Sequence, residues 1–286
     1  MLKKIKYYIK NRKLKNRENT FGPFAKGVIY ETANGLIAMS HQDMMIGKHL
    51  GFKGSWNLPE IESLKQLINK TDNIYVVGTH VGTLLIPLAK QCKTVVGYEA
   101  NPNTFWFLKQ NILLNDVKNT QIFNLAVGDE KRNITFYKSK INTGGSKIKP
   151  VHDNIKYNFD NPEEVEIPMI SLDQHIIENK LPAPDCVLMD IEGAEYLALQ
   201  GMQETLKNIR FLYMEYVPHH LKDVSGISNK DLMKLIVPFF DKAISTNKKI
   251  EIDISGSTDK LIEFLDDLNS SNTSDDLIFI KTSIPG

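Results

Sequence analysis

The sequence predicts an α/β fold built on an open, mostly parallel sheet. Between residues 73 and 125, short apolar runs alternate with segments of helical spacing in the order strand, helix, strand, helix, strand. That order is typical of parallel strands joined by right-handed crossovers. Near the end of the chain, apolar runs at 250–254 and 277–281 flank a helical segment and indicate an antiparallel closure of the sheet. The length of 286 residues allows one large domain with a small cap.

Residues 21–70 are expected to form this N-terminal cap. Residues 27–39 indicate a hairpin, because Asn34-Gly35 is a type I′ turn signal. Residues 58–69 place their apolar side chains at helical spacing. Asp43 lies between these segments and is expected to begin a turn or a helix.

Residues 71–286 are expected to form the main domain. Its predicted elements are strands at 73–77, 94–98, 121–125, 134–137, 166–170, 186–189 and 211–217, and helices at 83–91, 102–115 and 194–208. The spacing Ser171-Leu-Asp-Gln predicts the start of a further short helix. A polar, lysine-rich insertion at 138–164 is long enough for a functional lid, and a mobile loop is the alternative.

Composition excludes several classes of function. The formal net charge is +1, so no overall field attracts nucleic acid and no nucleic-acid partner is expected. Both cysteines lie in apolar surroundings, which favours a reduced, cytoplasmic setting over a disulfide framework. No apolar run reaches the roughly 18 residues of a membrane-spanning helix, and no signal-peptide pattern follows the basic start. The composition does not indicate an oligomeric state.

Positive charge is concentrated in residues 1–20, where the first 17 residues contain lysines and arginines but no acid. A basic amphipathic helix of this kind would make weak contact with an anionic membrane surface or a phosphorylated glycan. The alternative is a solvated terminal tail.

The turn after the first core strand predicts a cofactor site. Gly78 allows a tight turn there, and Gly82 allows the following helix to begin close to the strand. Backbone N–H groups at such a turn bind a carboxylate or a phosphate. Glu99 closes the second strand, where an acid accepts hydrogen bonds from both ribose hydroxyls of an adenosine. Together these features predict an adenosine-bearing cofactor.

The same turn favours a cofactor without phosphate. His80 occupies the second position of the Gly-x-Gly-x-x-Gly pattern and hinders the approach of a pyrophosphate to the backbone. S-adenosyl-L-methionine (SAM) has no phosphate and suits this turn better. A nicotinamide-dependent oxidoreductase is the rival interpretation.

Three acids follow the predicted strand at 186–189. The strand ends on Asp190, and Glu192 and Glu195 follow it. Ligands of open α/β sheets bind beyond the carboxyl ends of the strands, so these acids are expected to line the site. The alternative is that Asp190 caps the next helix and the glutamates are solvated. With Glu215 they could offer oxygen ligands to magnesium, but the spacing is not that of a tight site and no metal is assigned.

Several motifs in a fixed order tie these features together. They are the glycine turn, Tyr98-Glu99-Ala100-Asn101-Pro102, Asn111-Ile-Leu-Leu-Asn115, Leu125-Ala-Val-Gly-Asp129, Ile170-Ser-Leu-Asp173 and Met189-Asp-Ile-Glu-Gly-Ala-Glu195. With this set, residues 27–281 resemble the FkbM family of SAM-dependent methyltransferases. The resemblance implies a class I methyltransferase Rossmann-like fold, with a mostly parallel seven-stranded sheet and helices on both faces.

The resemblance also implies the activity: transfer of a methyl group from SAM to a hydroxyl of a carbohydrate or glycoconjugate. A non-glycan small molecule is the alternative acceptor. SAM would be bound by Gly78, Gly82 and Glu99, with Ala100 beside Glu99 and Ala126 near the adenine.

The chain departs from the family pattern at two positions of the glycine turn. The family usually has Asp-Val-Gly-Ala-Asn-Ile-Gly, and here Val76 replaces the acid and His80 replaces the asparagine. His80 either contacts the methionine tail of SAM or is a surface loop residue. Loss of the acid leaves a catalytically weak, methyltransferase-like binding protein as a second alternative.

Methyl transfer to a hydroxyl needs a group that removes a proton, because a sugar hydroxyl is a weak acid. Asp190 is the candidate best placed by topology, with Glu192 beside it. His219 is the third candidate, since it follows the strand at 211–217, and a surface location for it and His220 is the alternative.

Overall fold

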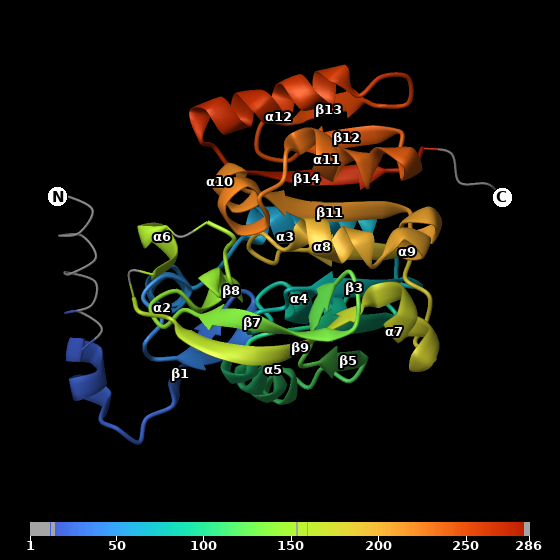
Figure 1. The fold of residues 1–286 in the computed structure, drawn as a ribbon. Helices are drawn as coiled ribbons and strands as arrows, with labels where there is room; N and C mark the ends of the chain where they lie inside the picture. The colour runs from blue at the N-terminus through green and yellow to red at the C-terminus, as the bar shows by residue number, and fades with distance from the viewer. Residues whose placement is uncertain (1–11, 13–14, 153, 159, 283–286) are drawn as a thin grey trace.

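The computed structural model describes residues 12, 15–152, 154–158 and 160–282, and Figure 1 shows its largest sheet with helices on either side. The parallel part of this sheet consists of β3 (Asn73–Val77), β4 (Thr94–Tyr98), β5 (Thr120–Phe123), β10 (Cys186–Met189) and β11 (Phe211–Tyr216). Three antiparallel strands complete it: β12 (Lys242–Ser245), β13 (Ile250–Asp253) and β14 (Asp275–Ile280). The spatial order is β13-β12-β14-β11-β10-β3-β4-β5.

This arrangement confirms the α/β class and the mostly parallel sheet. The described residues place eight strands in the sheet, one more than the family resemblance implies. The hairpin β12–β13 lies at the sheet edge beyond β14. The sequence analysis did not predict β12, because its four residues form too short a run to show a period and their pairing with β14 is a tertiary contact.

Both faces of the central strands are buried, as parallel sheets require. In β3 and β10, alternate residues point to opposite faces, so Tyr75 and Val187 belong to one hydrophobic cluster and Val76 and Leu188 to the other. The first cluster is covered by α8 (Glu195–Gln200), α9 (Gln203–Asn208), α11 (Asn229–Lys234) and α12 (Asp259–Ser271). The second is covered by α3 (Leu58–Leu67), α4 (Leu85–Ala89) and α5 (Pro102–Leu114). Each fully buried aliphatic side chain stabilises the fold by about 1.5–3 kcal/mol.

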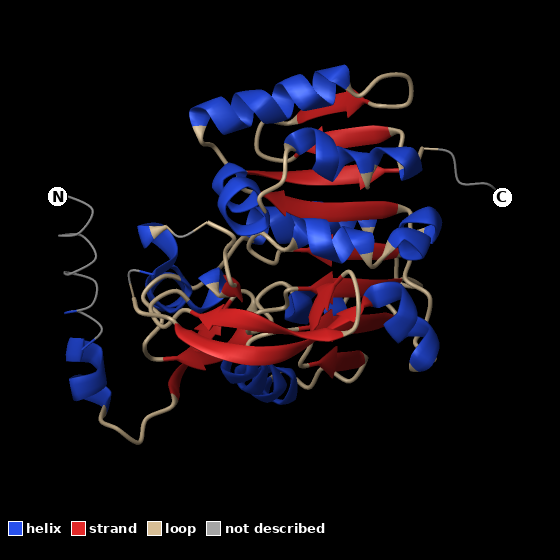
Figure 2. Cartoon of the chain, viewed as in Figure 1, coloured by secondary structure: helices blue, strands red, loops and turns tan. Residues whose placement is uncertain are grey.

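A second sheet lies beside the parallel strands (Figure 2) and contains β6 (Ala126–Gly128), β7 (Arg132–Lys138), β8 (Lys147–Ile148) and β9 (Glu163–Ser171). The strands expected at 134–137 and 166–170 are confirmed within β7 and β9. The insertion between them contains the short helices η1 (Thr143–Gly145) and α6 (Ile155–Asn158) and folds back through β8. After β9, α7 (Leu172–Glu178) begins at Ser171, whose side chain accepts a hydrogen bond from Gln174 N as the capping spacing predicted.

The expected hairpin and helix of the N-terminal segment are confirmed as β1 (Gly27–Thr32), β2 (Gly35–Ser40) and α3. The turn residues are Ala33 and Asn34, one position earlier than expected, and Gly35 follows with a φ of 117°. The buried Asn111 of α5 donates to Ala38 O and accepts from Ala38 N at 2.8 and 2.7 Å. These bonds fix the hairpin against the main sheet. A further helix, α2 (Ile46–Lys53), connects the hairpin to α3.

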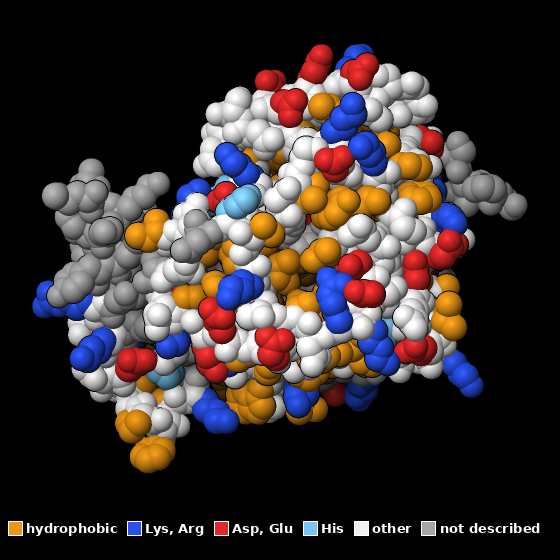
Figure 3. All heavy atoms as spheres, viewed as in Figure 1, with side chains coloured by type: hydrophobic (Ala, Val, Ile, Leu, Met, Phe, Trp, Pro, Cys, Tyr) orange, Lys and Arg blue, Asp and Glu red, His pale blue; other side chains and the backbone are white. Residues whose placement is uncertain are grey.

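The predicted basic contact surface falls mainly on residues 1–11 and 13–14, which lie outside the described residues. Within the described part, residues 15–21 are helical, and Arg17 donates to the backbone oxygen of Asp43 at 3.0 Å. In the parts of the chain that the structure describes, no helix is both long and apolar enough to cross a bilayer. Cys92 and Cys186 are free thiols, as expected. Figure 3 shows charges of both signs interspersed over one face of the molecule.

Candidate functional site

A cavity of about 270 Å³ opens at the carboxyl ends of the parallel strands, where open α/β sheets bind ligands. Its volume lies near the lower end of the range of about 300–1,000 Å³ that is usual for small-molecule sites. Its walls come from the turn after β3, the end of β4, residues 125–127, the insertion, the loop after β10 and the segment between α2 and α3.

The structure brings most of the predicted site residues to this cavity. The cavity is lined by Gly78, His80, Glu99, Ala100, Ala126, Asp190 and Glu192. Gly82 and His219 are not among the lining residues. His220, not His219, approaches the acids, since its Nε2 lies 3.2 Å from Glu192 Oε2.

The two glycines determine the shape of the turn. Gly78 has a φ of 90°, and a Cβ at this position would lie 1.8 Å from the backbone oxygen of Asp190. Any side chain there would force apart the loops that follow β3 and β10. Gly82 has a φ of 94°, a conformation that is unfavourable for residues with a Cβ. Gly82 therefore shapes the turn that leads into α4, and it is not among the residues that line the cavity.

Glu99 is held by backbone hydrogen bonds at the end of β4. His80 N donates to its Oε2 and Asn101 N to its Oε1, both at 2.8 Å. Burial raises the pKa of Glu99 to about 7, although the two backbone donors oppose this shift. An ionised carboxylate has about four acceptor positions, so each oxygen retains one for a ligand hydroxyl.

His80 forms part of a hydrogen-bonded chain that reaches the N-terminal segment. Its Nε2 lies 2.8 Å from Thr143 Oγ1, and Thr143 Oγ1 donates its only proton to Asp43 Oδ2 at 2.7 Å. Thr143 must therefore accept from His80, so Nε2 carries the ring proton. Burial lowers the pKa of His80 to about 4, and its buried Nδ1 is an acceptor without a partner in the described structure. His80 lies in the cavity wall. Its backbone is in the left-handed region, with a φ of 50°.

Asp43 orders two segments at once. Its Oδ1 accepts from Met45 N and Gly47 N, both at 2.9 Å, at the start of α2. Its Oδ2 accepts from Thr143 N at 2.8 Å as well as from the Thr143 hydroxyl. The expected helix-start role is confirmed, and the tie to the insertion is a contact that sequence reasoning missed.

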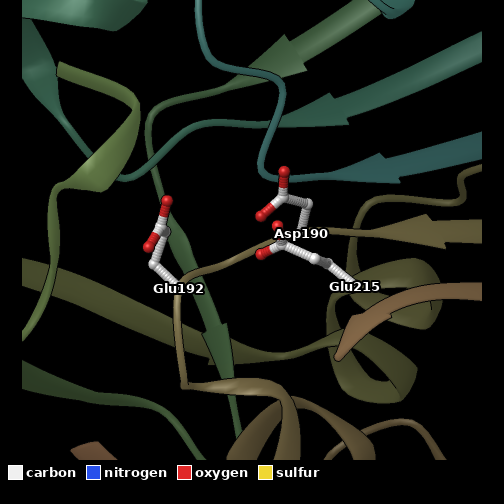
Figure 4. A group of neighbouring side chains, drawn as sticks. All are labelled: Asp190, Glu192 and Glu215. Carbon is white, nitrogen blue, oxygen red and sulfur yellow. The ribbon is translucent and has the colours of Figure 1, made fainter. Parts of the chain in front are cut away.

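Three of the carboxylates that line the cavity lie close together (Figure 4). Asp190 follows β10, Glu215 lies on the adjacent β11, and the ligand oxygens of both and of Glu192 lie within 4.8 Å of one another. Asp190 is exposed to the cavity, but desolvation by the surrounding protein raises its pKa well above its usual value, and the charge of Glu192 adds to the shift. The pKa of Glu215 is also raised, mainly by burial and next by the charge of Asp190. A side-chain hydrogen bond with Glu215 acts in the opposite direction and lowers the pKa of Asp190.

Asp190 does not cap the helix that follows it, which was the alternative role. Helix α8 begins after Ala194 without a side-chain cap. The neighbouring Glu195 folds back instead, and its Oε1 accepts from Ile191 N and Gly193 N at 3.2 Å. This hydrogen bonding fixes the loop that carries Glu192, which has a φ of 57°.

A buried lysine from the insertion neutralises Glu192. Lys147 Nζ lies 3.0 Å from Glu192 Oε2, and its side chain is only 6% exposed. His220 lies beside both groups, and burial followed by the charge of Lys147 lowers its pKa well below the usual value. Lys147 had no signal in the sequence, because it is one of many lysines in a polar segment.

The three carboxylates also have a spacing that one divalent cation could bridge. Lys147 already supplies a positive charge to one of them. The assignment of no metal stays a prediction, and chelation tests it below.

Comparison with known proteins identifies the family. Residues 77–266, more than half of the chain, match the model described as "Methyltransferase FkbM domain". The hexuronic acid methyltransferase AglP of Haloferax volcanii is 26% identical over 178 residues, which cover 62% of this chain and 66% of that protein. The 2-O-methyltransferase NoeI of Sinorhizobium fredii is 28% identical over 134 residues, covering 43% and 54%. The chain thus matches less than two thirds of the length of either relative.

Among solved structures, a methyltransferase FkbM from Methylobacillus flagellatus superposes with a TM-score of 0.43 and 14% identity, covering 74% of this chain and 44% of that one. The family predicted from the motifs is confirmed by the match to the family model. The chain belongs to the FkbM methyltransferase domain family.

Proposed function

We propose that the protein is a SAM-dependent O-methyltransferase that acts on a hydroxyl of a carbohydrate or glycoconjugate. The observation that carries the proposal is that Glu99 and the neighbouring acids Asp190 and Glu215 line one cavity in an FkbM-family chain. The first group suits a ribose diol and the second suits the removal of a proton.

The residues present fit SAM. Glu99 keeps free acceptor positions for the two ribose hydroxyls, and the cavity is small and apolar around Leu125 and Ala126, where an adenine would lie. The unpartnered Nδ1 of His80 suits a donor such as the ammonium group of the methionine tail. The N–H groups of the glycine turn suit the carboxylate of the tail. When bound, SAM supplies a methyl group on a positively charged sulfur.

Asp190 would act as the general base. Its raised pKa makes its carboxylate a stronger proton acceptor than an ordinary aspartate, and Glu215 holds it in place by their shared hydrogen bond. Base catalysis of this kind contributes about 10²–10⁴-fold to a rate. Glu192, held in place by Lys147, would orient the acceptor. His219 does not line the cavity, so we assign it no catalytic role.

The names of both curated relatives support the acceptor class. One name specifies a hexuronic acid and the other specifies a 2-O position, and both describe methyl transfer. No lysine or arginine lines the cavity in the described part of the chain, whereas nucleic-acid binding depends on such residues. A sugar hydroxyl therefore suits this site better than a phosphate-rich acceptor.

Two measurements test the proposal. Calorimetry should show that S-adenosylhomocysteine (SAH) binds and that NAD does not. No heat with SAH at millimolar concentration would instead favour the catalytically weak binding protein. Release of SAH from SAM in the presence of sugar acceptors should fall at least 100-fold in Asp190→Asn, while the variant stays folded.

Asp116→Asn is a matched control for that variant. Asp116 is exposed, lies outside the cavity and has a φ of 50°, which asparagine tolerates. Its turnover should equal that of the unmodified protein. Full activity in a folded Asp190→Asn protein would remove Asp190 from the mechanism.

A further inference from the structure

The cavity wall has a one-sided charge. Its acidic lining residues are Glu60, Glu99, Asp190, Glu192 and Glu215, and no lysine or arginine is among the described lining residues. Glu99 is assigned to the ribose, so the other acids face the remaining space. Lys147 pairs with Glu192, but it is not among the residues that line the cavity, and its side chain is only 6% exposed.

Glu60 adds a further acid to the cavity wall. It lies in the first turn of α3, where Asn57 Nδ2 donates to its Oε2 at 2.7 Å and Tyr213 makes a further side-chain hydrogen bond. Burial raises the pKa of Glu60 to about 7, and the charge of Glu60 in turn raises the pKa of Asp190. Glu60 and Asp190 thus line the same cavity and interact electrostatically.

The segment that precedes Glu60 is rigid. The side chain of Asn34, 1% exposed, accepts from Trp56 N and donates to Trp56 O, both at 2.8 Å. It also donates to Thr83 O at 2.9 Å, which ties this segment to the start of α4. Trp56 and Asn57 thus form a fixed wall that combines an apolar ring with an amide, a combination suited to the mixed faces of a sugar.

We propose that the acceptor is a sugar unit without an anionic group, bound against Trp56 and Asn57, and that Glu60 is a specificity-determining residue that rejects uronates. The inference rests on the proposed function and narrows its substrate class. A carboxylate placed in this space would lose hydration, face several acids and find no lysine or arginine among the described lining residues to pair with. The hydroxyls of a neutral sugar can donate to the same acids. This acceptor would differ from the hexuronic acid in the name of one relative.

Trp56 itself can report binding. The chain has two tryptophans, so Trp106→Phe leaves Trp56 as the sole indole. In that background, with SAH and a chelator present, Trp56 fluorescence is titrated with matched methyl glycosides and methyl uronides of the gluco, galacto and manno series. We expect saturable binding of a neutral glycoside at least tenfold tighter than its uronide. Glu60→Gln should reduce the ratio of glycoside affinity to uronide affinity at least threefold. Glu62 is an exposed neighbour on the same helix, and Glu62→Gln should leave this ratio unchanged.

The outcomes separate this inference from the proposed function. SAH binding, measured by calorimetry on the same sample, tests the cofactor site alone. If SAH binds but a uronide binds as tightly as its neutral partner, or no sugar gives a saturable signal, the inference is overturned. A preference that reverses to the uronide when magnesium replaces the chelator would also overturn it. An unchanged ratio in Glu60→Gln would remove Glu60 as the determinant.

Discussion

The ring of His80 donates a hydrogen bond to Thr143, because Thr143 gives its own proton to Asp43. This relationship leaves the buried His80 Nδ1 as an acceptor without a partner in the described structure, on a residue that lines the cavity. It also connects the glycine turn to the insertion and to the N-terminal segment. His80, at the position where the family usually has asparagine, is therefore part of a hydrogen-bonded chain with residues that lie far away in sequence.

Thr143→Val should weaken SAH binding about two- to tenfold, the range for loss of one net hydrogen bond of about 0.5–1.5 kcal/mol. Valine keeps the shape of threonine but cannot accept from His80 or donate to Asp43. Calorimetry measures the change, and Thr143→Ser, which keeps the hydroxyl, should restore most of the affinity. Equal affinity in the valine and wild-type proteins would show that the chain does not position His80 for the cofactor.

Glu99→Gln should weaken SAH binding about 10- to 150-fold, because hydrogen bonds to a charged group contribute about 1.5–3 kcal/mol. Glutamine retains the shape and one acceptor oxygen but offers no carboxylate to the ribose. Glu31→Gln, at an exposed position on β1, is the control and should bind normally. Unchanged affinity in Glu99→Gln would refute the ribose assignment.

Glu192→Gln should move the acid limb of the pH–rate profile to lower pH. The charge of Glu192 raises the pKa of Asp190, so its removal lowers that pKa. Asp190 must be deprotonated to accept a proton, and activity is therefore lost as the pH falls through its pKa. Profiles of kcat for both proteins give the comparison. A limb that stays in place or moves upward would contradict Asp190 as the titrating base.

Lys147→Met should lower the free energy of unfolding by about 3 kcal/mol, because removing one partner leaves Glu192 without its compensating charge in a mostly buried pair. Denaturant titration measures this change. Lys149→Met is the matched control two residues away, where the pair with Glu164 is half exposed and should contribute nothing measurable. Equal stability of the two variants would mean that Lys147 is not needed to neutralise Glu192.

Chelation should leave turnover unchanged. Lys147 compensates the charge of Glu192, and a side-chain hydrogen bond joins Asp190 to Glu215, so we expect the acids to need no divalent cation. Activity is measured after dialysis against EDTA and again after magnesium is added. Loss of activity that magnesium restores would assign the three carboxylates to a metal.

Local patterns predicted the features that depend on local chemistry. Gly78, Glu99 and Asp190 follow strands whose apolar runs are visible in the sequence, and the carboxyl ends of parallel strands meet at one sheet edge. Topology alone therefore placed them together. The hairpin turn lies one residue earlier than expected, and the side chain of its Asn34 is hydrogen-bonded to Trp56, a contact that no local pattern reveals.

Features that depend on contacts distant in sequence were not predictable. Nothing distinguishes Lys147 from the other lysines of the insertion until the chain folds and buries it against Glu192. Whether His219 or His220 lies near the acids likewise depends on how the short helix after β11 orients the two rings. The tie from Asp43 to Thr143 spans residues whose separation no periodicity reveals.

A crystal structure of the protein with SAH tests the central claim most directly. The account predicts both ribose hydroxyls within about 3 Å of the Glu99 carboxylate oxygens and the sulfur facing Asp190. An SAH molecule bound with its ribose away from Glu99, or with its sulfur directed away from the Asp190–Glu215 pair, would contradict it.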